Sequence, residues 1–231
     1  GMTPDARADA TATTRDAVGV WSWAADAHDL VELTEEGRLV SNEAISMILL
    51  DTDRLEYLGG QFTHAVVASM DWDRMAEFFR TGRALETRPD RYRASIERLT
   101  EQDIAVFFQE VLSALPQLVV DLSGGGRLLD VHCGGGLWLV AMARRFPAVT
   151  GVGVEGEPDS VARARVHVAA AGLDARLEIH TGDVSAATDR GPFDLVYYQY
   201  ALHSLADPAA SLRAAWSAVR PGGRIIVLDW P

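Results

Sequence analysis

The sequence predicts an α/β fold in which a doubly wound parallel sheet follows a mostly helical domain. The apolar runs at residues 128–131 and 149–154 have the length and composition of strands that are buried on both faces. Segments with helical spacing separate such runs through the second half of the chain, and this alternation is typical of parallel sheets. Residues 19–122 carry helical spacing over most of their length, which predicts a separate helical domain.

The pattern with the most information lies between residues 127 and 183. The first apolar run leads directly into three consecutive glycines at 134–136, and apolar residues then recur at helical spacing to about Phe146. The second apolar run ends on Glu155. Strand, glycine turn, helix, strand and acid in this order are the parts of a nucleotide-binding crossover.

The chemistry of this pattern suits a nucleoside. Glycines let the backbone approach a ligand at positive φ, and the next helix begins with unpaired N–H groups. Glu155, at the end of the second strand, is placed to accept hydrogen bonds from both hydroxyls of a ribose. Gly182 and Asp183 follow a third strand at 177–180, where the adenine would lie. We therefore expect a nucleoside across the turn, with its sugar at Glu155 and its base near Asp183.

Two motifs resemble those of a known family. The run LLDVHCGGG, residues 128–136, resembles the first motif of class I S-adenosylmethionine-dependent methyltransferases, and RPGGRIIVLDW, residues 220–230, resembles the segment before and through their fifth strand. The resemblance covers roughly the second half of the chain and implies a Rossmann-like domain over residues 123–231. The family fold continues with another helix and an antiparallel pair of strands that this chain lacks, so we expect the domain to be incomplete at its C-terminus.

The resemblance also assigns cofactor-binding residues. It implies that Gly134 and Gly136 form the turn under S-adenosylmethionine, and that Asp130 braces this turn near the methionine amino group. His132 stands where the family has its first glycine. An imidazole at this position either crowds the methionine end of the cofactor or hydrogen-bonds to its carboxylate.

The first half of the chain gives two further expectations. Residues 1–18 are rich in Thr, Ala and Asp without apolar periodicity, which predicts a mobile tail. The segment DWDRMAEFFRTGRAL, residues 71–85, resembles part of the N-terminal winged-helix dimerisation domain of small-molecule O-methyltransferases. This resemblance implies that residues 19–122 serve as a dimerisation and lid domain in a homodimer. A winged helix that reads DNA is the alternative.

Composition narrows the classes of function. A net charge of −12 and a pI of about 4.9 argue against a nucleic-acid partner, because contacts to phosphates need a basic face. No apolar stretch approaches the length of a membrane span. The single cysteine, Cys133, excludes an internal disulfide and a multi-cysteine zinc site, so we expect no metal and a cytoplasmic protein. All 21 basic residues are arginine, which removes phosphate-loop lysine and Schiff-base chemistry.

His203 is the candidate catalytic base. It lies just beyond the predicted fourth strand, at the edge of the sheet where ligands bind. Its neighbourhood, ALHSLAD, resembles the segment in which plant-type O-methyltransferases keep their catalytic histidine, and Asp229 stands where that family has an acid that orients it. The alternative role for His203 is packing at the start of a helix. Tyr198, on the same predicted strand, is expected to line the ligand site.

These observations predict an enzyme that transfers a methyl group from S-adenosylmethionine to a small molecule. Its most specific form is an O-methyltransferase acting on a hydroxyl of an aromatic or polyketide-like acceptor. Two alternatives remain. One is a relative that binds S-adenosylmethionine without methyl transfer, and the other is a nicotinamide-dependent dehydrogenase. A dehydrogenase needs G-x-G-x-x-G spacing to seat a pyrophosphate, and residues 132–138 lack its third glycine.

Overall fold

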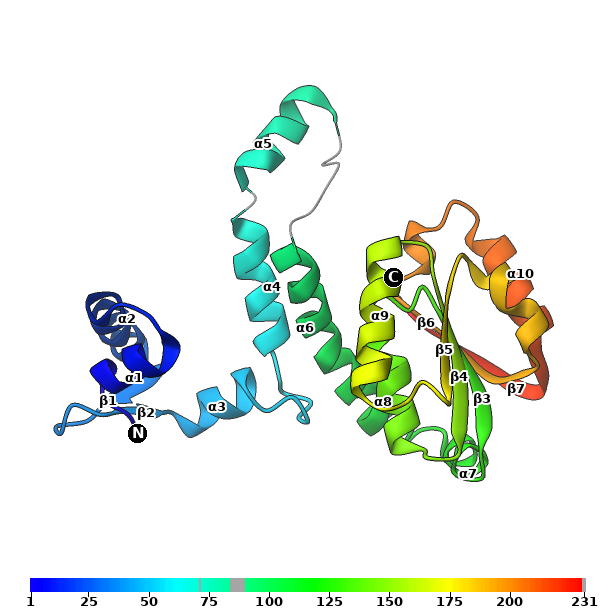
Figure 1. The fold of residues 1–231 in the computed structure, drawn as a ribbon, viewed down its shortest axis with the longest axis horizontal. Coiled ribbons are helices and arrows are strands. Elements are labelled where there is room, and N and C mark those ends of the chain that lie inside the picture. The colour runs from blue at the N-terminus through cyan, green and yellow to red at the C-terminus, as the bar shows by residue number, and fades with distance from the viewer. Residues whose placement is uncertain (71, 84–89, 230–231) are drawn as a thin grey trace. The chain divides into compact units, whose positions relative to one another are not determined.

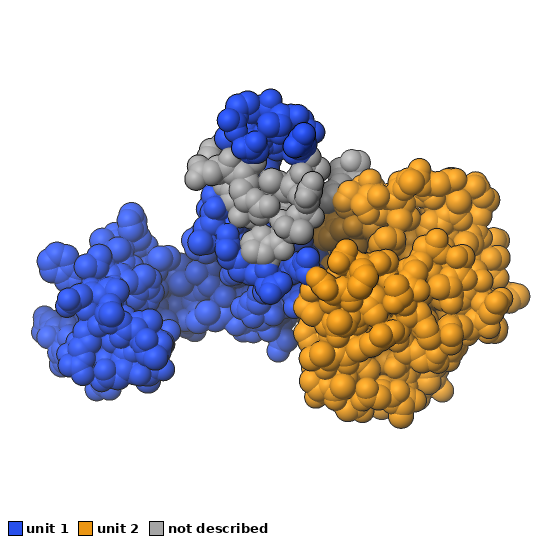
Figure 2. Space-filling model, turned by 45° about the horizontal axis from the view of Figure 1, so that its top comes forward, with its two compact units in different colours: residues 1–105 blue, residues 106–231 orange. Residues whose placement is uncertain are grey.

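The computed structural model describes residues 1–70, 72–83 and 90–229 (Figure 1). The chain divides into two units, residues 1–105 and 106–231 (Figure 2). The sequence places this boundary at 122/123, and the structure places it 17 residues earlier. Residues 106–122 join the second unit because their apolar side chains, among them Leu118 and Leu122, are buried there.

The first unit consists of helices and one short hairpin. Its elements are α1 (Pro4–Thr11), α2 (Arg15–Ala27), β1 (Val31–Leu33), β2 (Leu39–Ser41), α3 (Glu43–Leu49), α4 (Gly59–Ser69), α5 (Trp72–Thr81) and α6 (Asp90–Val106), the last crossing the boundary by one residue. Strands β1 and β2 pair antiparallel. The winged helix and the homodimer stay predictions. Of the segment 71–85 that carries the resemblance, residues 71, 84 and 85 lie outside the described residues.

The start of the chain differs from the sequence prediction of a mobile tail. Helix α1 lies within residues 1–18, and α2 begins there as well. Thr3 caps α1 by accepting a hydrogen bond from the Ala6 N–H at 3.2 Å, and Pro4 occupies the first helical position. Ala8 is fully buried. A cap, a proline and one small buried residue order this helix, and none of them produces an apolar period in the sequence.

The second unit holds a five-stranded sheet in which all pairs are parallel, in the order β5-β4-β3-β6-β7. Its elements are η1 (Phe107–Val111), α7 (Pro116–Ser123), β3 (Gly126–Val131), α8 (Leu137–Arg145), β4 (Val149–Glu155), α9 (Pro158–Ala170), β5 (Leu177–Thr181), η2 (Val184–Arg190), β6 (Phe193–Gln199), η3 (Leu202–Ser204), α10 (Pro208–Ala218) and β7 (Val219–Leu228). Helices α8 and α9 cover one face of the sheet, and α10 covers the other (Figure 1). The predicted α/β class is therefore confirmed.

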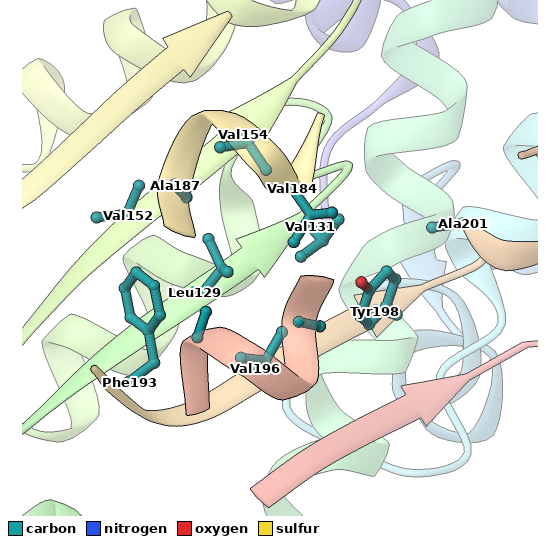
Figure 3. Packing of buried hydrophobic residues seen from close by; sticks show 12 residues of the cluster. Leu129, Val131, Val152, Val154, Val184, Ala187, Phe193, Val196, Tyr198 and Ala201 are labelled. Carbon is teal, nitrogen blue, oxygen red and sulfur yellow. The ribbon is translucent and has the colours of Figure 1, made fainter. Parts of the chain in front are cut away.

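The two faces of the sheet pack by different means. On the α10 face, apolar side chains of the strands, of η2 and of α10 form the cluster in Figure 3. On the α8 face, Gly151 and Gly153 of β4 leave room for neighbouring side chains. A Cβ on Gly151 would lie 2.7 Å from Cδ1 of Leu139, and one on Gly153 would lie 2.8 Å from Sγ of Cys133. These glycines let α8 and the turn before it lie close against the sheet.

The strand order reverses beside β3. From β3 the chain moves outward through β4 to β5, then crosses back so that β6 lies on the other side of β3, with β7 beyond it. In open parallel sheets, ligands bind beyond the carboxyl ends of the strands at this switch point. The segments that follow β3, β4, β5, β6 and β7 all meet at that edge.

No single helix among the described residues is both long enough and apolar enough to cross a bilayer. Residues 90–111 and 116–123 meet the length and composition test only when they are taken together across a sharp bend.

The close approach of α4 to α6 gives a stability test. A Cβ on Gly60 would lie 1.9 Å from the carbonyl oxygen of Arg98, which is backbone and has little freedom to move. We expect Gly60→Ala to lower the free energy of unfolding by about 3 kcal/mol in denaturant titrations. Gly19→Ala is the matched control, because a Cβ there meets nothing within 4 Å inside α2. It should raise stability by about 0.5–1 kcal/mol. Equal effects of the two substitutions would contradict this packing.

Candidate functional site

The glycine turn between β3 and α8 has left-handed backbone at three positions. The φ angles are 57° at His132, 53° at Gly134 and 70° at Gly136. The conformation suits the two glycines, whereas it is uncommon for a residue with a Cβ. Gly136 caps α8, and its N–H donates to the Cys133 carbonyl at 2.7 Å. The chain thus makes a tight turn at the carboxyl end of the central strand.

Glu155 ties this turn to β4. Its carboxylate accepts one hydrogen bond from the Gly134 N–H at 3.0 Å and one from the Glu157 N–H at 2.8 Å. The side chain is 8% exposed. A second link between the same segments runs from the Cys133 N–H to the Val154 carbonyl at 3.1 Å. The acid predicted to hold a ribose therefore lies directly against the glycine turn, and each of its oxygens keeps a lone pair for a further donor.

A third tie comes from α9, where Nδ1 of His167 lies 2.8 Å from the Gly135 carbonyl oxygen. An Nδ1–H donor gives a hydrogen bond in this geometry. The sequence assigns His167 no role. Its contact joins residues 32 positions apart, and no local spacing in the sequence marks it.

Gly182 and Asp183 follow β5 at the same edge. The Gly182 N–H donates to the Glu155 backbone carbonyl at 2.9 Å, and Gly182 has a φ of 135°. The carboxylate of Asp183 accepts hydrogen bonds from the hydroxyl and the N–H of Ser185, which lower the pKa of Asp183. The charge of His132 makes a smaller contribution in the same direction.

Asp130 lies beneath the turn. It is 3% exposed, and its pKa is well above the ordinary value because burial disfavours the charged form and the charge of Glu155 adds to this. Burial, with the charges of Asp130 and Glu155, also raises the pKa of the Cys133 thiol. A thiol with a raised pKa is a poor nucleophile at neutral pH. Cys133 therefore acts here as a packing residue against Gly153 of β4.

His203 and Asp229 form a hydrogen-bonded pair at the ends of β6 and β7. Nδ1 of His203 donates to Oδ1 of Asp229 at 2.6 Å. Oδ2 of Asp229 accepts from the Leu202 N–H at 2.8 Å and from the His203 N–H at 3.3 Å. The Asp229 side chain is 11% exposed, whereas that of His203 is about half-exposed. The carboxylate thus fixes both the backbone and the ring of His203.

Tyr198 lies apart from the other candidate residues. Its side chain is buried in the cluster on the α10 face, and its hydroxyl lies 2.9 Å from Oγ of Ser211 (Figure 3). The alternation of side chains along a strand explains this position. Tyr197 is the tyrosine on the face of Asp130, with which it pairs in register, and its ring stacks on Trp138 at 4.2 Å between centroids. Because the two tyrosines are adjacent and identical, the sequence alone does not show which of them lies on the face of Asp130.

The structure therefore brings most of the predicted site residues to one edge of the sheet. The residues at this edge are Asp130, His132, Gly134, Gly136, Glu155, Gly182, Asp183, His203 and Asp229. A hydrogen bond connects the glycine turn to Glu155. The sequence prediction of the site did not include three neighbours of this edge, His167, Trp138 and Tyr197.

Comparisons with known proteins agree on the class of this unit. Residues 128–223 match the family described as a methyltransferase domain. A ubiquinone biosynthesis O-methyltransferase from Aeromonas salmonicida is 38% identical over 112 residues, which are 47% of this chain and 46% of that protein. The corresponding protein of Stutzerimonas stutzeri is 37% identical over 101 residues, 44% of this chain and 43% of its own length. The chain thus spans about half the length of the curated relatives it matches.

Solved structures show the same fold over nearly the whole chain. An O-methyltransferase family protein from Burkholderia thailandensis has a TM-score of 0.61 at 20% identity, covering 98% of this chain and 69% of that one. The mitomycin 7-O-methyltransferase has a TM-score of 0.60 at 22% identity, with the same coverage of both chains. These similarities confirm the fold class that the sequence predicts.

The raised pKa of the buried Asp130 carboxyl predicts how the stability of the fold depends on pH. Because its pKa is raised in the folded chain, the folded state binds this proton more tightly than the unfolded state does. That contribution to stability is complete below the ordinary aspartate value near 4, and it is lost as pH rises through the folded value. We expect Asp130→Asn to raise the free energy of unfolding at pH 8 by about 1 kcal/mol or more, with little gain at pH 4. Denaturant unfolding at both pH values measures this.

The exposed Asp189 in η2 provides the control substitution, Asp189→Asn, which should change stability equally little at both pH values. A destabilised Asp130→Asn variant at pH 8 would mean that the ionised carboxylate stabilises the fold.

Proposed function

We propose that the protein transfers a methyl group from S-adenosylmethionine to a hydroxyl of a small acceptor, because residues 128–223 match a family described as a methyltransferase domain. The observation that supports this proposal is that two groups of residues lie along one edge of the sheet. The glycine turn with Glu155 is suited to a nucleoside, and the His203–Asp229 pair is suited to moving a proton.

The residues at the turn fit the cofactor. A Cβ added at Gly134 would meet no atom within 4 Å, so the backbone there borders open space. Glu155 offers carboxylate lone pairs to ribose hydroxyls beside this space, and α8 begins three residues after Gly134. Asp183 lies beyond Glu155 in the strand order, at the position proposed for the adenine.

When bound, S-adenosylmethionine supplies a methyl group on a sulfonium that is already a good leaving group. The protein's main task is therefore to align an acceptor oxygen with that methyl group. Positioning of this kind contributes about 7–11 kcal/mol to lowering a barrier. Glu155 and Asp183 would orient the nucleoside, while Asp130 would face the amino group under the turn.

His203 is proposed as the base. Its Nδ1–H is held by Asp229, so the lone pair is on Nε2, which is free to take a proton from an acceptor hydroxyl. The hydrogen bonds from Leu202 and His203 N–H groups keep Asp229 in place as the orienting acid. A positioned base of this type contributes about 10²–10⁴ in rate.

We further propose an aromatic or polyketide-like acceptor. The curated relatives are named as O-methyltransferases of ubiquinone biosynthesis, and one solved neighbour is a mitomycin 7-O-methyltransferase. An acidic hydroxyl on an aromatic ring suits a histidine base, since the proton transfer is then close to balanced near neutral pH. The homodimer predicted from the first unit belongs to the same proposal. Exposed apolar residues of α2, Val20 and Trp23 among them, support it.

Calorimetric titration of the 231-residue chain with S-adenosylmethionine, S-adenosylhomocysteine and NADH tests the cofactor. We expect micromolar binding, about −8 kcal/mol, of the first two and no binding of NADH. Glu155→Ala and Asp183→Ala should each weaken binding about tenfold or more, because each removes an acceptor for the nucleoside. Glu157→Ala, which keeps its backbone N–H, is the matched control. Unchanged affinity in both variants would place the nucleoside elsewhere, and tight NADH binding would favour a dehydrogenase.

The base is tested by the pH dependence of kcat with a panel of phenolic acceptors, measuring S-adenosylhomocysteine formed. His203→Ala should lower kcat about 10²–10⁴-fold and remove the rise of kcat with pH that accompanies deprotonation of the imidazole. Affinity for S-adenosylhomocysteine should not change. Ser204→Ala, on the adjacent exposed residue, is the control. Wild-type turnover in His203→Ala would leave His203 a packing role, and cofactor binding without turnover of any acceptor would favour a binding protein.

A further inference from the structure

Helix α9 packs directly against the glycine turn. It lies beside α8 on one face of the sheet (Figure 1). A Cβ on Gly136 would lie 3.3 Å from Cβ of Ala164, which is fully buried on α9. Three residues further along this helix, Nδ1 of His167 lies 2.8 Å from the Gly135 carbonyl oxygen. Because residues three apart share one face of a helix, the same face of α9 makes both contacts.

The Gly135 carbonyl belongs to a peptide group that is held at both ends. The N–H of this group, on Gly136, donates to the Cys133 carbonyl at 2.7 Å. The peptide group before Gly134 is fixed as well, since its N–H donates to the Glu155 carboxylate at 3.0 Å. Of these bonds, only the one at His167 has its donor in a side chain. A substitution at His167 therefore removes one bond of the turn and leaves the residues of the turn unchanged.

Glycine makes this bond important for the conformation of the turn. The peptide group between Gly135 and Gly136 is flanked by residues without a Cβ, so it can rotate at little steric cost. A run of three glycines then has several accessible conformations, and the observed turn is one of them. When only a fraction of molecules has the binding conformation, the apparent affinity for a ligand falls by that fraction.

The donor itself comes from a firmly anchored helix. Val161, Ala164 and Val168 bury one face of α9. The guanidinium of Arg165 donates to the Ile179 carbonyl of β5 through Nε at 3.3 Å and Nη2 at 3.0 Å. Helix α9 is thus bonded to β5 next to the residue that bonds it to the turn. Nδ1 of His167 is held in place by a part of the fold that does not include the glycines.

We propose that His167 is a positioning residue of the cofactor site. Its Nδ1–H donates to the Gly135 carbonyl and keeps the glycine turn in the conformation that binds the nucleoside. The inference rests on the proposed function, and it assigns to α9 a role in cofactor affinity that is exerted through the turn.

The experiment compares two substitutions at His167 by calorimetric titration with S-adenosylhomocysteine. His167→Asn keeps an N–H donor at about the place of Nδ1, whereas His167→Leu has a branched side chain without a donor. We expect His167→Leu to weaken binding about 5- to 10-fold, because the released turn populates other conformations. His167→Asn should recover most of this loss. Leucine is the better helix former, so a role in the stability of α9 alone would give the opposite order.

The same two substitutions at Val166 are the matched controls, because Val166 is 64% exposed on α9. They should leave the affinity at the wild-type value. Wild-type affinity in His167→Leu, or equal affinities of His167→Leu and His167→Asn, would overturn the inference.

Nitrogen NMR of the imidazole in the wild-type chain tests the hydrogen bond without any substitution. The neutral ring of His167 should carry its proton on Nδ1 before a ligand is added. A proton on Nε2 instead would overturn the inference, even where neither variant folds. If wild type binds S-adenosylhomocysteine and the variants or the tautomer contradict the expectation, the inference alone fails. If wild type does not bind S-adenosylhomocysteine, the proposed function fails and the inference fails with it.

Discussion

The site depends on the carboxylate of Glu155, which accepts backbone N–H groups from both Gly134 and Glu157. These bonds join the end of β4 to the glycine turn and to the residue before α9. Asp130 lies nearby, and its pKa is raised by burial and, to a smaller extent, by the charge of Glu155.

The turn is ordered by the chain itself before a ligand binds. Cys133, Gly134 and Gly135 are bonded through main-chain groups to β4, Glu155 and His167. Close packing beneath the turn supports these bonds, since Gly151 and Gly153 let α8 and Cys133 lie against the sheet. A site prepared in this way loses less entropy on binding than a loop that must be ordered first. We therefore expect that a substitution that disturbs packing in the sheet also disturbs the geometry of the turn and weakens ligand binding.

The sequence predicts the second unit well because its signals are local. Apolar runs of strand length, three glycines and the acid at 155 each depend on residues close in the chain, and the structure has strands and a turn at these places. Contacts across the fold left no such signal. His167 reaches Gly135 over 32 positions, and Phe107 joins the second unit through rings at 138 and 197. The sequence likewise did not show that Thr3 and Pro4 order α1. Nor did it show which of the two adjacent tyrosines, Tyr197 or Tyr198, lies on the face of Asp130.

The charges along the sheet edge argue for the class of ligand. Carboxyl groups of Asp130, Glu155 and Asp183 lie at or beside the turn that would carry a phosphate in a dinucleotide-binding protein. A pyrophosphate brings two negative charges into this environment, and like charges at close range oppose binding. A ligand with a sulfonium and an ammonium group brings positive charge instead. Its single carboxylate is then the one group of the ligand that these acids disfavour.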